Sequence, residues 1–251
     1  MGKIPRESAD EMIKHWLLNL AVEHPVWLGC LFPAVDAEGL NVKPLPRCKA
    51  LDYARGLLEL LDAGMIKLSS EVSGDDVESG LGAARVLDRF VRLSNDDPAL
   101  CRGSRLLPMY ERNPLPGMQV EFELTPRGGE AWERVAEPDW SRLFTVSRDS
   151  TSGELISPDR DLLMALMGWY SEIHHGETIQ RDTIRWQTHT DYAILYWKRV
   201  PLVCHASFGL QAAEAPWPGW GPEWFRDWYF SAVSWHRKPW DLPGWPPESQ
   251  E

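Results

Sequence analysis

Gln119-Val120-Glu121-Phe122-Glu123-Leu124-Thr125-Pro126 is the stretch that says most about the fold of this 251-residue chain. Polar and apolar residues alternate up to Leu124, and this alternation predicts a strand with one buried face. Thr125 can cap a following helix, and Pro126 suits the first helical position. We therefore expect a strand that passes directly into a helix, whose apolar contacts are Ala131, Trp132 and Val135.

A second helix is predicted upstream, over residues 47–63. Gly64 follows it and is placed to end it, because glycine readily adopts a left-handed conformation. Residues 65–68 then read as a short strand. The apolar face expected for the helix consists of Leu51, Ala54, Leu57, Leu58 and Leu61.

These two regions resemble parts of one known family. Residues 57–68 resemble the third helix and first wing strand of winged-helix domains, and residues 122–128 resemble the strand-to-helix step that follows the wing. The resemblance implies a winged-helix-like domain over residues 1–138, with an insertion at about 69–118 that is much longer than the usual wing. Within it we expect a surface loop over residues 73–82 and a helix over residues 83–93.

The resemblance implies a possible DNA contact. In a DNA-binding member, the helix that carries Arg47, Lys49 and Arg55 would enter the major groove. The same helix carries three acidic residues, which phosphates would repel: Asp52, Glu59 and Asp62. The alternative is a winged-helix scaffold used for protein contact or dimerisation.

The composition changes near residue 140. Of the 14 tryptophans, 10 lie after this position, and we therefore predict a second, tryptophan-rich domain over residues 139–251. Strands are expected at residues 144–146, 155–156, 183–186, 192–197 and 202–208, with residues 198–201 connecting the last two. A helix capped by Ser157 is expected between the second and third strands. Helix against antiparallel sheet predicts an α+β fold.

The C-terminal region carries the predicted partner-binding residues. A short helix over about 222–235 would align several large rings, and Trp and Tyr are enriched at interface hot spots. The alternative is that these rings close the core of the second domain. The candidate partner-binding residues are Trp217, Trp220, Trp224, Trp228 and Trp235.

The formal net charge is −11, from 37 acidic and 26 basic residues. Such a charge opposes nucleic acid, although a local basic patch would still allow it, and it favours a protein partner with a basic surface. No apolar run approaches the ~20 residues of a membrane span, and we predict no membrane association. The four cysteines show no paired spacing, which indicates reduced thiols and a cytoplasmic protein.

No catalytic, metal or cofactor motif is recognised. His174 and His175 with Glu177 do not match a metal-binding spacing, and Cys204 falls within an expected strand as a core thiol. A site assembled from distant residues would escape such a search, and Asp182, His189 and His205 are the polar residues around which it could form.

Three functional hypotheses follow. The first is a non-enzymatic, acidic, tryptophan-rich protein-binding module, of the kind found in immunity proteins and in accessory factors of antiviral defence. The second is a winged-helix transcriptional regulator with a C-terminal ligand-sensing domain. The third is an enzyme of unrecognised type. The sequence leaves the partner and the oligomeric state open.

Overall fold

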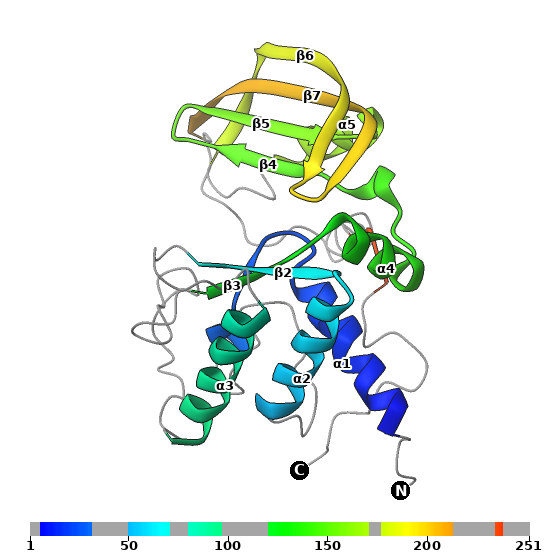
Figure 1. The fold of residues 1–251 in the computed structure, drawn as a ribbon. Coiled ribbons are helices and arrows are strands. Elements are labelled where there is room, and N and C mark those ends of the chain that lie inside the picture. The colour runs from blue at the N-terminus through cyan, green and yellow to red at the C-terminus, as the bar shows by residue number, and fades with distance from the viewer. Residues whose placement is uncertain are drawn as a thin grey trace, which may run out of the picture. The chain divides into compact units, whose positions relative to one another are not determined.

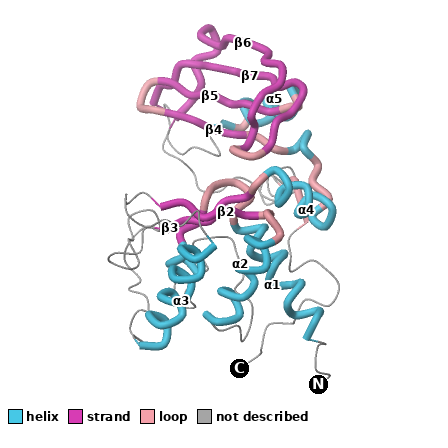
Figure 2. Tube along the Cα trace, in the orientation of Figure 1, coloured by secondary structure: helices cyan, strands magenta, loops and turns pink. Residues whose placement is uncertain are grey.

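The computed structural model describes residues 6–31, 50–70, 80–96, 120–170, 177–212 and 234–237. The chain divides into two compact units between Ala136 and Glu137, and the second unit ends at Arg237. Helices and antiparallel sheets are both present (Figure 2), so the α+β fold class is confirmed. Among the described residues, no helix has the length and apolar composition needed to cross a membrane.

A three-stranded antiparallel sheet organises the first unit, in the order β1-β3-β2. Phe122 lies at its centre, paired with Val26 on one side and Leu68 on the other. The predicted alternation is confirmed, because buried and half-buried residues alternate along the whole of β3. The strands are β1 (Val26–Trp27), β2 (Ile66–Ser70) and β3 (Val120–Leu124).

Helices cover this sheet. Figure 1 shows α1, α2 and α3 side by side on one side of β2 and β3, with α2 packed against both neighbours. A short 3-10 helix, Leu28–Leu31, follows β1. The α-helices are α1 (Arg6–Leu20), α2 (Ala50–Asp62), α3 (Gly80–Asp96) and α4 (Pro126–Ala136).

The end of α2 is built as predicted around Gly64, whose φ is +65°. The amide of Gly64 donates to the carbonyl of Leu61, and the amide of Met65 donates to that of Leu60, both at 2.8 Å. This pair of bonds is a Schellman motif, which requires a left-handed residue. Thr125 donates its hydroxyl to the Gly64 carbonyl at 2.7 Å and accepts from the Gly128 amide at 3.2 Å. Thr125 therefore caps α4 and ties it to the end of α2.

The predicted apolar face of α2 is partly wrong. Leu51 is 54% exposed, and Leu58 and Leu61 are only half-buried. The face turns instead toward α1, where Tyr53 stacks on Trp16 with ring centroids 5.2 Å apart. The buried residues of α2 are Ala50, Tyr53, Ala54, Gly56, Leu57 and Leu60.

Two further expectations need correction. Residues 80–82 belong to α3 and not to a surface loop. In α4, Trp132 is fully buried and its indole N–H donates to Asn19 at 3.3 Å, whereas Val135 is 39% exposed. Val135 therefore contributes little to the apolar contacts predicted for this helix.

The second unit is built on a four-stranded antiparallel sheet in the order β4-β5-β7-β6. Helix α5 (Arg160–Gly168) packs on one face, where its Leu163 and Leu166 meet Leu155, Phe208 and Leu210 of the sheet. The strands are β4 (Thr145–Arg148), β5 (Ser152–Ser157), β6 (Glu177–Leu195) and β7 (Lys198–Ala212).

The second unit differs from prediction at three places. Residues 183–186 and 192–195 were predicted to lie in separate strands, but both belong to β6. The β6–β7 hairpin turns at Tyr196–Trp197, and residues 198–201 belong to β7 and not to the connection. The N-cap of α5 is Asp159, which accepts from the Asp161 and Leu162 amides. Ser157 lies inside the sheet and donates to the carbonyl of Leu143 at 2.8 Å.

Candidate functional site

Three tryptophans from distant parts of the sequence meet in the second unit. Trp140 belongs to a 3-10 helix, Trp140–Arg142, and Trp197 to the β6–β7 turn. The rings of Trp140 and Trp197 meet edge to face, with centroids 6.0 Å apart, and that of Trp235 lies 5.2 Å from Trp140. Trp235 is only 6% exposed, whereas Trp140 and Trp197 are half-buried. We call Trp140, Trp197 and the neighbouring Tyr196, which is 40% exposed, the aromatic surface.

Three ion pairs each include a residue within two positions of Trp140, Trp197 or Trp235 in the sequence. Asp139 pairs with Arg142 at 3.2 Å, Asp191 with Arg199 at 2.8 Å, and Glu137 with Arg237 at 2.6 Å. The ammonium of Lys198 lies 4.9 Å from the Trp140 ring centroid, a cation–π contact. The acidic residues of these three pairs are therefore neutralised by their partners.

Of the five tryptophans predicted to bind a partner, only Trp235 lies within the described residues. It is not helical, and it supports Trp140 from the buried side while its own backbone carbonyl accepts from the Asp139 amide at 2.7 Å. Trp217, Trp220, Trp224 and Trp228 lie outside the described residues, as does most of the predicted helix over 222–235.

A second group of polar side chains crosses β5, β7 and β6. His189 Nε2 lies 3.3 Å from His205 Nδ1, and His205 Nε2 lies 3.7 Å from a carboxylate oxygen of Glu154. A hydrogen bond between two imidazoles needs an N–H on one ring and a lone pair on the other. His205 Nε2 is buried without a hydrogen-bond partner, so the row of hydrogen bonds does not extend to Glu154.

The described residues contain no group of three or more His, Cys, Asp or Glu side chains arranged to hold a metal. Asp182 and His189 both lie on β6, but Asp182 is exposed and lies within the irregular pairing between Gln180 and Arg185. Cys204 is a half-buried free thiol that packs against the sheet's core. His174 and His175 lie outside the described residues.

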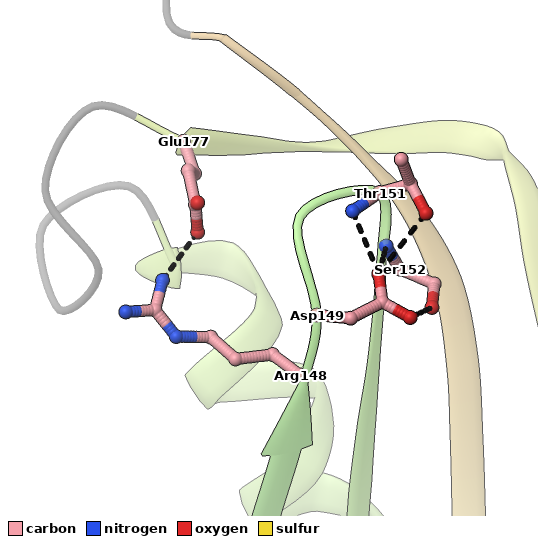
Figure 3. Close-up of polar contacts among 5 residues, drawn as sticks. All are labelled: Arg148, Asp149, Thr151, Ser152 and Glu177. Carbon is pink, nitrogen blue, oxygen red and sulfur yellow. Dashed lines mark hydrogen bonds and ion pairs between the residues drawn. The ribbon is translucent and has the colours of Figure 1, made fainter.

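The β4–β5 turn holds a carboxylate with a strongly lowered pKa (Figure 3). Asp149 accepts hydrogen bonds from the amides and hydroxyls of both Thr151 and Ser152, at 2.7–3.0 Å. These bonds, the one from the Thr151 amide first, lower the pKa of Asp149 to about 2. Beside it, Arg148 pairs with Glu177 at the start of β6. The carboxylate is committed to shaping the turn, and we assign it a structural role.

The predicted DNA-contacting residues are only partly described. Arg55 is half-buried on α2, whereas Arg47 and Lys49 lie outside the described residues. The exposed residues of α2 are Leu51, Glu59 and Asp62, and Glu59 pairs with Lys14 at 3.3 Å. The outward surface of α2 therefore carries two carboxylates.

No protein-family model, curated protein or solved structure matches this chain.

The aromatic surface was not predicted from the sequence. Trp140 was noted only as a domain boundary, and Trp197 as the end of a strand. The contact with Trp140 spans 57 positions, and no local pattern reports it.

Proposed function

We propose that this chain is a non-enzymatic protein-binding module that uses the aromatic surface of its second unit. The observation that supports this is the exposure of Tyr196, next in sequence to the half-buried Trp197, whose ring meets Trp140, while buried Trp235 packs against Trp140. Trp and Tyr supply large contact areas with few rotatable bonds, and they dominate interface hot spots. Rings fixed by packing lose little further freedom when a partner binds.

We propose a partner with a basic surface, on the strength of the net charge of −11. Because the acids beside the aromatic surface are paired, this attraction acts at long range and the rings act at contact. Long-range charge mainly sets the association rate, and buried contacts mainly set the dissociation rate. Added salt is therefore expected to slow association and to leave dissociation nearly unchanged.

The test is affinity capture from the host with the wild-type chain, followed by titration of the purified partner. Trp197→Ala is expected to weaken the one-to-one complex by about 30-fold, the effect of losing roughly 2 kcal/mol at a hot spot. Met164→Ala is the matched control, because Met164 is an exposed apolar residue, at 54%, on α5. Equal affinities of the two variants for the partner would show that the aromatic surface is not part of the interface.

Immunity and defence-accessory roles belong to this class. If the captured partner is a basic nuclease or another toxin, one equivalent of the chain should inhibit it, and Trp197→Ala should require an excess. If a saturating concentration of this protein leaves the partner's activity unchanged, an immunity role is excluded.

A second candidate, a winged-helix regulator with a C-terminal ligand-sensing domain, is favoured by one feature. Strand β2 follows α2 directly, where the resemblance expects a wing strand, and it pairs antiparallel with β3. Glu59 and Asp62 on the outward surface of α2 oppose it. Binding to promoter DNA at low salt that Arg55→Glu abolishes would support the regulator, and its absence would exclude it.

A further inference from the structure

The face of the second sheet that lies away from α5 carries two neighbouring histidines. Phe208 of β7 packs in the cluster beneath α5. Successive side chains of a strand point to opposite faces, so His205, three residues earlier on β7, points to the other face. His205 lies opposite Gln187 of β6, and His189 is two residues further along that strand. His189 therefore reaches His205 diagonally across the two strands.

Both histidines stand on a regular part of the sheet. They lie where β6 pairs evenly with β7, from Arg185 to Thr190, and β5 continues the sheet beyond β7. Both are half-buried, and the ring of Tyr192 lies beside that of His189, with centroids 5.8 Å apart. Side chains on strands hold a binding geometry more precisely than side chains on loops.

The spacing of the two facing nitrogens suits a tetrahedral metal ion. His189 Nε2 lies 3.3 Å from His205 Nδ1. Zinc binds imidazole nitrogens at ~2.0–2.1 Å, so two such nitrogens at a tetrahedral angle lie about 3.3–3.4 Å apart. At the right angles of square-planar or octahedral coordination, the same bond lengths would bring them to about 2.8–3.0 Å. The observed separation matches the tetrahedral value.

The second nitrogen of His205 gives an independent indication. His205 Nε2 is buried and has no hydrogen-bond partner, and a carboxylate oxygen of Glu154 lies 3.7 Å from it. A histidine that binds a metal through one nitrogen carries its proton on the other, and commonly donates it to a carboxylate. The side chain of Glu154 is 51% exposed, and a movement of about 0.5 Å would bring it within hydrogen-bond distance of Nε2.

We propose that His189 Nε2 and His205 Nδ1 bind one Zn²⁺ ion, with Glu154 orienting His205 and water completing the tetrahedron. Both facing nitrogens must then offer lone pairs, so the proton of the hydrogen bond between them moves to the other nitrogen of its own ring, and both rings stay neutral. Two imidazoles are half the ligand set of a structural zinc site. The dissociation constant is therefore expected at about 10 μM, far weaker than that of a four-ligand site.

The first test observes the imidazole nitrogens of the full wild-type chain by ¹⁵N NMR. Zinc chloride should shift His189 Nε2 and His205 Nδ1 and leave the proton on His189 Nδ1 and His205 Nε2. This measurement needs no substitution, so it stands even if a variant fails to fold. Zinc binding that shifts neither of the two facing nitrogens would overturn the proposal.

The second test is calorimetric titration of variants with zinc chloride. His189→Ala and His205→Ala should each weaken binding at least tenfold. Glu154→Gln should weaken it about tenfold, the usual effect of losing a carboxylate that orients a ligand. Circular dichroism verifies that each variant is folded.

Two controls address the other histidines. His24→Ala, at an exposed position in the first unit, and the double variant His174→Ala/His175→Ala, which removes two adjacent histidines of the sequence, should each change the affinity less than threefold. Wild-type chain that binds no zinc at about 1 mM, a hundred times the expected constant, would overturn the proposal. So would equal affinities of His189→Ala and wild type, or loss of the site in His174→Ala/His175→Ala.

Discussion

His15 is a buried histidine with a ring nitrogen that has no hydrogen-bond partner. The residue is 8% exposed, and its Nε2 has no hydrogen-bond partner. Burial lowers the pKa of His15 to about 4, because the charged form cannot be solvated there. The imidazole therefore remains neutral in the folded chain well below the pH at which it protonates in the unfolded chain.

Acid should destabilise the first unit through this residue. The unfolded chain takes up the proton as pH falls below about 6.5, whereas the folded chain takes it up only near pH 4. Stability is therefore full above pH 6.5 and decreases between 6.5 and 4, by on the order of 3 kcal/mol. His15→Phe should flatten this part of the profile in urea titrations. His24→Phe, at an exposed position, should leave it unchanged, and an equal slope in His15→Phe would contradict the assignment.

Asp149 should also make the fold less stable in acid, but over a lower pH range and through hydrogen bonds to its ionised form. Because its folded pKa is lowered to about 2, the stability it contributes is present above pH 3.8 and is lost as pH falls toward 2. Asp149→Ala should speed amide exchange at Thr151 and Ser152 at pH 6, measured by NMR. Asp182→Ala provides an exposed carboxylate control. Unchanged exchange in Asp149→Ala would show that the backbone alone holds the turn.

At the scale of elements, the contact between α4 and the end of α2 depends on Gly128, which has no side chain. A Cβ on Gly128 would lie 1.9 Å from the Met65 carbonyl oxygen. That oxygen already accepts from the Thr125 amide at 3.0 Å and belongs to the backbone, so it cannot move alone. The approach of α4 to β2 therefore requires glycine.

Gly128→Ala should destabilise the first unit by about 3 kcal/mol, toward the upper end of overpacking substitutions. Gly168→Ala is the control, because a Cβ there meets nothing within 4 Å. It should leave stability unchanged or raise it by a few tenths of a kcal/mol. Thermal unfolding followed by circular dichroism makes the comparison, and a neutral Gly128→Ala would mean that α4 does not hold this position.

Local sequence patterns predicted the helices and strands better than they predicted the contacts between them. Strand β3 and its step into α4 were predicted because Val120, Phe122 and Leu124 alternate with acids and because Thr125-Pro126 is a helix start. The face of α2 was misplaced because leucines occur nearly all around it, and packing against α1, α3 and β2 decides which residues are buried. The β6–β7 turn was missed because Tyr196-Trp197 contains no glycine, asparagine or proline.

At the scale of the molecule, the two compact units predict separable folding. Glu137–Arg237 contains its own sheet, helix and buried cluster, as an independent domain requires. A fragment of these residues should give a dispersed NMR spectrum and cooperative unfolding, with the His189–His205 pair preserved. A fragment of 141–231, which lacks Trp140 and Trp235, is the control and should be less stable. A disordered 137–237 fragment would show that the second unit depends on the rest of the chain.

The hydrogen bond from Asp139 to Trp235 and the ion pair between Glu137 and Arg237 place the two ends of the second unit next to each other. A segment that starts and finishes at one point can be spliced into a surface loop of an unrelated host without stretching it. It could equally be given new termini by joining residue 137 to 237 through a short linker. The second unit could therefore be inserted into another protein, and the inserted segment would retain the aromatic surface.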